Sequence, residues 1–182
     1  MAATDAAIPA VKWPSVPACY GWLSLDRRGN WRLKGEVVRH AGLIAFINRN
    51  YAADENGNRV FHNGPQKVYV DLDYAPLVLR LGIDGELTAH TGMPAGEASA
   101  AFIDEEGNAL LLVAAGIGLL DDRDLPAFLA TCRDANGITA SDAALIESMQ
   151  GGSGLWWRGL PLQPIRRDDL PRRFGFRPAP AA

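Results

Sequence analysis

Three residues in the first half of the chain could together do acid–base or metal chemistry: Asp71, Asp73 and His62. The two aspartates alternate with apolar residues from Val68 onwards, so on a β-strand they share one face, with Cβ atoms about 6–7 Å apart. Two carboxylates at that spacing can bind a cation or separate their pKa values for acid–base work. His62, beside Asn63 in an expected loop, could complete such a site. The group therefore predicts, as one alternative, a small metal-dependent or acid/base hydrolase.

A solvated strand face explains the same aspartates more simply, because one side of an amphipathic strand is expected to be polar. His40, His62 and His90 lack the H-x-H or H-x-x-x-H spacing that holds a metal. Cys19 and Cys132 lack the paired spacing of a structural zinc site, and we expect two buried thiols instead of a disulfide. The sequence therefore predicts no metal and no cofactor.

No residue stands out as a catalytic nucleophile. Ser141 and Ser153 lie outside any G-x-S-x-G turn, and Cys19 has no base near it in the sequence. The glycines around Ser153 follow an expected helix instead of opening one, so their N–H groups do not form a phosphate cradle. The catalytic residues are therefore unknown, and the sequence favours a non-catalytic ligand-binding, protein-binding or regulatory module over an enzyme.

Residues that could contact a ligand are scattered along the chain. Trp156 and Trp157 are adjacent on an expected strand, so one indole fills the core and the other can contact a ligand or a protein together with Arg158. Arg49 lies near the end of an expected helix. The candidate ligand-binding residues are Arg49, His62, Asp71, Asp73, Trp157 and Arg158.

The composition is that of a folded globular protein, with 182 residues, 48% of them hydrophobic and 21% charged. The net charge of −3 hides an acidic region at 97–147 and six arginines within 158–177. We expect these regions to pair internally or to be solvated, although the arginines of 166–173 could meet an anionic partner. The charge balance makes nucleic acid an unexpected partner. A small molecule or a protein is expected instead, and an exposed edge strand would allow a homodimer.

The sequence predicts no membrane segment. Residues 1–10 contain no Lys or Arg and run into prolines, unlike a secretory leader. The longest apolar run, Ala109–Leu120, is interrupted by two glycines and is too short to cross a bilayer as a helix. We therefore expect a cytoplasmic protein that does not contact a membrane.

A turn of the form Asp-x-x-Gly-Asn recurs at Asp26, Asp54 and Asp104. An Asp side chain can accept hydrogen bonds from its own turn, and Gly supplies the positive φ of a hairpin with a bulge. A calcium loop would need oxygen ligands at alternating positions and a closing Glu, which these segments lack. We therefore interpret the turns as hairpins between short strands.

The expected fold class is α+β, with two small lobes, each an antiparallel curled sheet or partial barrel packed with one or two helices. Helices are expected over 39–51, from Asp122 or Asp124 towards Asn136, and over 141–149. Residues 12–92 would form the N-terminal lobe and residues 93–177 the C-terminal lobe, with 1–11 and 178–182 as flexible ends. The joint is expected at 92–96, and a cleft between the lobes would be the natural ligand site.

Four stretches of the chain resemble a known family: Val16–Asp26, Gly42–Tyr51, Phe61–Gln66 and Val68–Leu72. The family consists of small proteobacterial proteins known only as a domain of unknown function. The resemblance covers about residues 16–135. It implies a bacterial, cytoplasmic α+β protein, and it carries over no catalytic or binding residue.

Overall fold

The first part of the chain forms a six-stranded sheet. The structure is a computed structural model that describes residues 12–152 and 154–182, so the expectations for residues 1–11 and for Ser153 lie outside the described residues. The strands of this first sheet are β1 (Ala18–Leu25), β2 (Trp31–Leu33), β3 (Glu36–Val37), β4 (Tyr51–Ala53), β5 (Arg59–Asn63) and β6 (Gln66–Leu72), in the order β3-β2-β1-β6-β5-β4.

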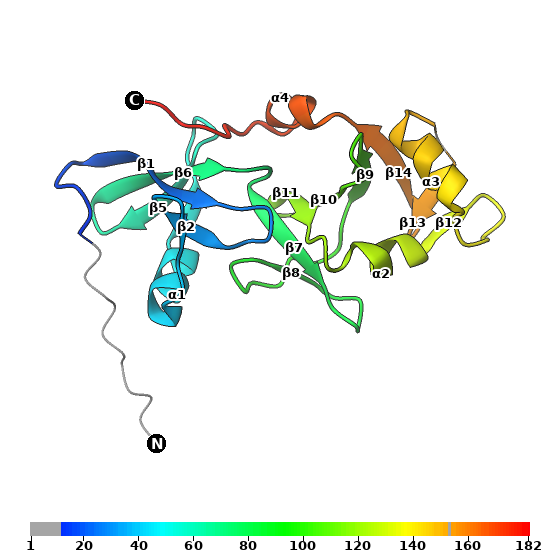
Figure 1. Cartoon of the computed structure of the whole chain (residues 1–182), viewed down its shortest axis with the longest axis horizontal. Helices are drawn as coiled ribbons and strands as arrows, with labels where there is room; N and C mark the ends of the chain where they lie inside the picture. The colour runs from blue at the N-terminus through cyan, green and yellow to red at the C-terminus, as the bar shows by residue number, and fades with distance from the viewer. Residues whose placement is uncertain (1–11, 153) are drawn as a thin grey trace, which may run out of the picture.

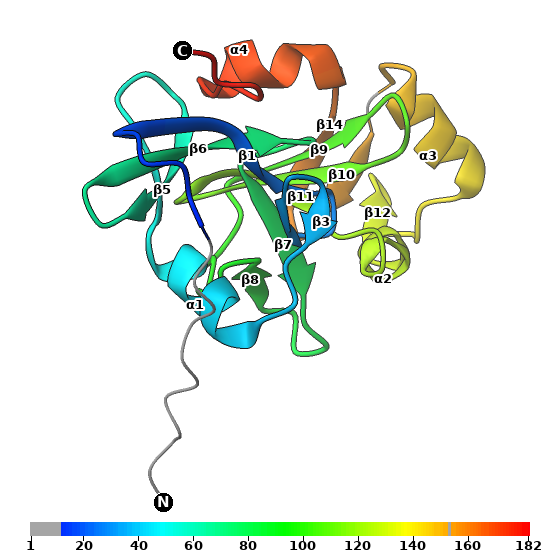
Figure 2. The ribbon, with the colours of Figure 1, turned by 60° about the vertical axis from the view of Figure 1, so that its left-hand side comes forward.

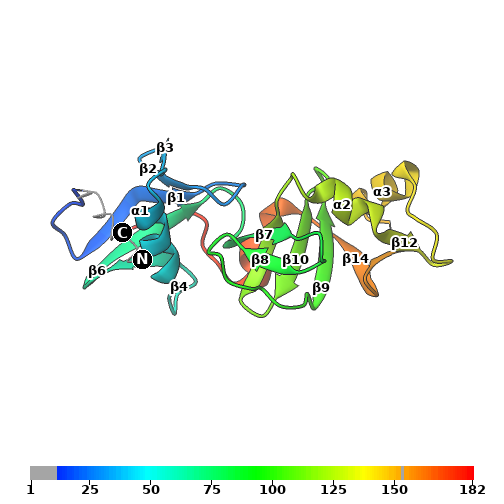
Figure 3. The same cartoon turned by 90° about the horizontal axis from the view of Figure 1, so that it is seen from below.

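The second part forms an eight-stranded sheet beside the first (Figures 1 and 3). Its strand order is β12-β13-β14-β9-β10-β11-β7-β8. The strands are β7 (Leu77–Leu81), β8 (Leu87–Ala89), β9 (Ala100–Asp104), β10 (Ala109–Val113), β11 (Gly116–Leu120), β12 (Cys132–Asp134), β13 (Leu155–Trp157) and β14 (Leu160–Ile165).

The α+β class is confirmed, but both sheets are mixed where the sequence predicts antiparallel ones. Strand β1 pairs with β6 in parallel, β7 with β11, and β9 with β14. A tight hairpin turn can connect only two antiparallel strands, whereas the two strands of each parallel pair are connected by a long stretch of chain. Local turn signals therefore predict the antiparallel pairs and miss the three parallel ones.

Strands β7 and β8 pair within the second sheet, although the sequence predicts a first lobe that extends to residue 92. The change of sheet falls at 73–76, between β6 and β7. The segment 92–96 lies instead against β8, through the pairs Thr88–Pro94 and Ala95–Leu87. Whether each sheet is a domain of its own stays a prediction.

Two of the three expected helices form, and each begins after a residue whose side chain caps it. Helix α1 (Ala41–Arg49) is capped by the His40 imidazole, which accepts a hydrogen bond from the Leu43 N–H. Helix α3 (Asp142–Met149) is capped by the Ser141 hydroxyl, which accepts one from the Ala144 N–H.

The remaining helical segments differ from the expectation. Helix α2 (Leu125–Ala130) ends well before Asn136, because the chain from Cys132 pairs with β13 as β12. The Asp124 carboxylate does not cap α2, since Arg80 and the Leu81 N–H occupy it. A 3-10 turn, η1 (Arg167–Asp169), and helix α4 (Leu170–Phe174) form in the C-terminal part without having been predicted.

The recurring turns are hairpins, as predicted, and in each the aspartate closes its own loop. The Asp104 Oδ1 atom accepts the N–H groups of Glu106 and Asn108, and the Asn108 side-chain amide donates to Oδ2 at 2.8 Å. The same three bonds recur at Asp26 and Asp54. Burial alone would raise the pKa of Asp26, but the bonds from Asn30 and its neighbours outweigh burial and lower it.

The last residues cross back from the second sheet to the first (Figures 1 and 2). Phe176 is buried in a core cluster to which both sheets contribute, and the Pro178 carbonyl accepts a hydrogen bond from the Leu72 N–H at 2.7 Å. The segment 178–182, expected to be flexible, thus begins against β6, and Pro180 is buried. Among the described residues, no helix is long and apolar enough to cross a membrane.

We predict that Asp104→Ala lowers the free energy of unfolding by about 3 kcal/mol, because three hydrogen-bond donors of the turn and the buried Tyr74 hydroxyl lose their acceptor. The matched control is Asp134→Ala, where a half-buried carboxylate accepts only the Asn136 and Ile138 N–H groups. The control should cost about 1 kcal/mol. Urea unfolding measures both, and equal losses would contradict the prediction.

Candidate functional site

The structure does not bring His62 together with the two aspartates. His62 on β5 pairs with Lys67 of β6, and Asp71 lies four residues further along β6. At about 3.3 Å per residue, that separation is about 13 Å. Asp71 and Asp73 do interact, since burial and then repulsion from Asp73 raise the pKa of Asp71. Among the described residues, no group of three or more His, Cys, Asp or Glu could hold a metal ion.

Trp157 is the indole that fills the core, and not the one left to contact a ligand. It is 1% exposed, packs on Phe128 and donates from Nε1 to the Thr131 hydroxyl at 3.0 Å. Alternation along β13 leaves Trp156 on the opposite, half-buried face. Arg158 stacks on Trp157 and donates to the Gly85 carbonyl at 2.7 Å, so it ties two turns of the second sheet together.

Arg49, in contrast, lines a pocket of about 450 Å³ between the two sheets. We call this the inter-sheet pocket. The first sheet contributes the end of α1, β4 and β5, and the second contributes β7, β8, the segment 91–95 and the β10–β11 turn. The lining residues are Asn48, Arg49, Tyr51, Arg59, Leu77, Ala89, Thr91, Met93, Pro94, Ala95 and Ala115, and none of them carries a carboxylate.

Arg59 is the second cation of the inter-sheet pocket. It pairs with Val70 of the core and so stands on the core-facing side of β5, where its guanidinium lies 5.9 Å from the centre of the Tyr51 ring. The Nε atom is buried and has no hydrogen-bond partner within the described residues. No ion pair in that part of the chain joins Arg49 or Arg59 to a carboxylate. An uncompensated, partly buried guanidinium favours a negatively charged neighbour.

His90 lies beside this cation in an aromatic cluster that joins the sheets. Its ring meets Trp31 and Tyr51 edge-on, with centroids 5.4 Å apart in both pairs. Nδ1 accepts the Val78 N–H at 3.2 Å, so the neutral ring carries its proton on Nε2, which is buried and finds no hydrogen-bond partner in the part of the chain that the structure describes. Burial, and then the charge of Arg59, lower the pKa of His90 to about 4. The imidazole is therefore neutral near pH 7.

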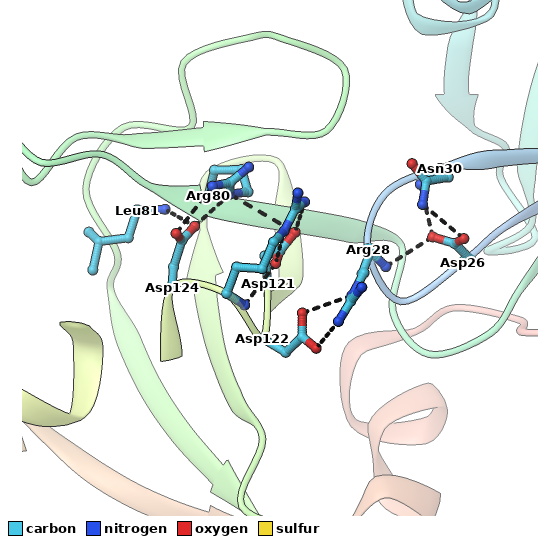
Figure 4. Close-up of polar contacts among 9 residues, drawn as sticks. Asp26, Arg28, Asn30, Arg80, Leu81, Asp121, Asp122 and Asp124 are labelled. Carbon is cyan, nitrogen blue, oxygen red and sulfur yellow. Dashed lines mark hydrogen bonds and ion pairs between the residues drawn. The ribbon is translucent and has the colours of Figure 1, made fainter. Parts of the chain in front are cut away.

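A second cavity at the junction, of about 470 Å³, is lined by charges that satisfy one another. Arg28 pairs with Asp122 at 2.7 Å (Figure 4), and Arg32 pairs with Asp26 at 3.1 Å. Beside this cavity, Arg80 pairs with Asp124 at 2.6 Å. Asp73 also lines the cavity, with its side chain exposed. Of these pairs, Arg28–Asp122 joins the two sheets. Because its charges are paired, this cavity leaves less charge for a ligand than the inter-sheet pocket does.

With this geometry in view, the comparisons with known proteins place the chain in a family. Residues 4–181 match the family model DUF2944, described as "Protein of unknown function (DUF2946)". The chain belongs to this family. The resemblance to a family of unknown function is thereby confirmed, and no protein with a curated description matches the chain.

Two solved structures are similar to the chain, and both are DUF1285 family proteins. The one from Silicibacter pomeroyi DSS-3 has a TM-score of 0.53 and 18% identity, covering 84% of each chain. The one from Shewanella baltica OS155 has a TM-score of 0.41 and 13% identity, covering 69% of this chain and 97% of the other. At such identity, the first likeness supports the fold alone.

Sequence reasoning missed Arg59, although the sequence holds a signal for it. Arg59 and Phe61 are two residues apart on one strand and so share a face, and Phe61 is fully buried. A cation at a core-facing strand position is unusual and indicates either a partner or a ligand. Met93 and Ala115 reach the pocket from turns whose placement depends on the pairing of the second sheet, so the sequence carries no comparable signal for them.

We predict that His90 makes the native state less stable as the pH falls from about 6.5 to about 4. The unfolded chain binds a proton on this ring near pH 6.5, whereas the native chain resists protonation down to about pH 4. The loss reaches about 3 kcal/mol. His90→Asn keeps a side-chain acceptor for Val78 but cannot titrate, so urea unfolding across this range should show a shallower decline in the variant. Parallel declines would contradict the prediction.

Proposed function

We propose that this protein is a non-catalytic module that binds a small organic anion in the inter-sheet pocket. The observation that carries the proposal is the pair of arginines, Arg49 and Arg59, in a pocket whose walls hold no carboxylate. The arginines of the neighbouring cavity pair with carboxylates, whereas neither Arg49 nor Arg59 forms an ion pair among the described residues.

The chemistry of the pocket favours a carboxylate or phosphate. A guanidinium presents several N–H donors in one plane and binds either group with two parallel hydrogen bonds. The Asn48 carbonyl oxygen accepts the Trp31 indole N–H at 2.7 Å, which leaves the Asn48 amide hydrogens to donate into the pocket. Every charged or amide group of the lining thus offers donors.

The apolar walls favour a ligand with a small hydrocarbon part. Leu77, Ala89 and Pro94 line one side, and Met93, which is 66% exposed, stands at the rim. A volume of about 450 Å³ lies within the range of metabolite sites, which is roughly 300–1,000 Å³. Methionine adapts its shape to different apolar groups, so the rim suits more than one anion.

A regulatory role follows from the position of the pocket. Because both sheets contribute walls, a bound anion contacts both and favours the arrangement in which they meet. The proposal includes a cytoplasmic location, which the two free, buried thiols of Cys19 and Cys132 support.

The proposal predicts that small organic anions raise the melting temperature and that Arg59→Gln abolishes this effect. We would measure the melting temperature at low ionic strength with mono-carboxylates, dicarboxylates and phosphorylated metabolites. At least one of these three classes should raise the melting temperature of the protein. Titration calorimetry with the best anion should then show binding at least tenfold weaker in Arg59→Gln, because the charge-assisted hydrogen bonds are lost.

Arg39→Gln is the matched control, because it removes the same charge from an exposed position outside the pocket. It should bind like the wild-type protein. A panel without any stabilising anion, or equal binding by Arg59→Gln and the wild type, would overturn the proposed function.

A further inference from the structure

A groove of about 1000 Å³ is lined by residues of α3, of the end of β14, of α4 and of the segment that leads into α4. Figures 1 and 2 show α3 and α4 near the end of β14. It is separate from the inter-sheet pocket and shares no lining residue with it. Three arginines of the C-terminal segment line it: Arg166, Arg172 and Arg173. We call it the arginine groove.

Within the described residues, these arginines form no ion pair with the acidic region of the chain and are exposed, which agrees with the solvation that the sequence analysis gives as the alternative to internal pairing. In the described residues, the ion pairs of Glu106, Asp121, Asp122 and Asp124 go to arginines at positions 27, 28, 80 and 123. The one ion pair of the groove arginines joins Arg172 to Asp169 at 3.4 Å, and the Arg172 side chain is 87% exposed. The arginine groove therefore keeps most of its positive charge available.

Two carboxylates also line the groove, and both have local partners. The Glu105 side chain accepts the Arg167 backbone N–H at 3.0 Å, and Asp169 contacts Arg172. Arg173 lies over the Phe102 ring at 4.7 Å, which leaves its N–H edge without an acid partner in the described residues. The groove as a whole is thus cationic.

The floor of the groove is apolar. Ile146 of α3 is 53% exposed, and Met149 lies one turn further along the same helix. Exposed aliphatic side chains beside free arginines are typical of protein interfaces, where arginine and methionine are enriched.

We propose that the arginine groove docks an acidic segment of a partner protein that carries at least one aliphatic or aromatic side chain. The carboxylates of such a segment match Arg166, Arg172 and Arg173, and its apolar side chain covers Ile146 and Met149. A peptide fits better than a metabolite, because the groove lies at the upper limit of metabolite sites and its arginines are spread along a rim.

The test uses fluorescein-labelled 12-residue peptides that contain glutamate and leucine. In one set the leucines recur at the three-to-four-residue spacing of a helix, and in the other they alternate with glutamate as on a strand. Fluorescence anisotropy with the full chain should show micromolar binding by at least one set and weaker binding as salt rises. Replacing glutamate with glutamine, or leucine with serine, in the peptide should weaken binding at least tenfold.

The protein variant Arg166→Gln/Arg172→Gln should also bind at least tenfold more weakly, with an unchanged melting temperature because both side chains are exposed. Its control, Arg39→Gln/Arg177→Gln, removes the same charge from exposed positions outside the groove. Three outcomes overturn the proposal: no peptide binds, both variants bind equally, or inorganic phosphate binds as tightly as the best peptide and displaces it.

Discussion

The arrangement of the two sheets depends on the buried carboxylate of Asp104. It closes its own turn in the second sheet and accepts the hydroxyl of Tyr74, which stands where the chain passes from one sheet to the other. The Tyr74 ring lies between the guanidiniums of Arg27, from a first-sheet turn, and Arg167, from the C-terminal segment. The Asp104 carboxylate thus holds Tyr74, the residue that the Arg27 turn, the Asp104 turn and the C-terminal segment all contact.

The turns that the sequence repeats are also the places where distant parts of the chain touch. In the turn at Asp26, the Arg27 side chain donates a hydrogen bond to Asn108, and the Arg28 side chain donates one to Asp122, both in the second part of the chain. The turn at Asp104 receives Tyr74 and also, through Glu105, the backbone of Arg167. A loop closed by its own side chain loses little further entropy when it docks, which makes such tips suitable contact points.

Much of the fold follows from local signals in the sequence. The Asp-x-x-Gly-Asn hairpins, the helices α1 and α3 and the free thiols are as predicted, because each depends on residues close in sequence or on single side chains. The parallel pairings and the assignment of β7 and β8 to the second sheet depend on contacts between distant segments, for which a single sequence holds no direct signal.

The candidate site was predictable only in part, for the same reason. From the sequence, Arg49 is a candidate, and a ligand cleft is expected between lobes that meet at 92–96. Arg59, in contrast, becomes a pocket residue only once β5 and the β10–β11 turn lie together. Trp157 shows the reverse case. Two adjacent indoles must face opposite sides of a strand, and the choice between them depends on Phe128 and Thr131, far from β13 in the sequence.

The return of the C-terminal segment to the first sheet has a consequence for synthesis on the ribosome. Phe176 fills part of the core cluster to which both sheets contribute. The backbone around Gly175 packs directly on the turn at Gly57, so a side chain at position 57 would not fit. Strands β1 to β6 leave the ribosome long before these residues do. The first sheet therefore completes its packing only after residues 175–178 have been synthesised, long after its own last strand, β6, has emerged.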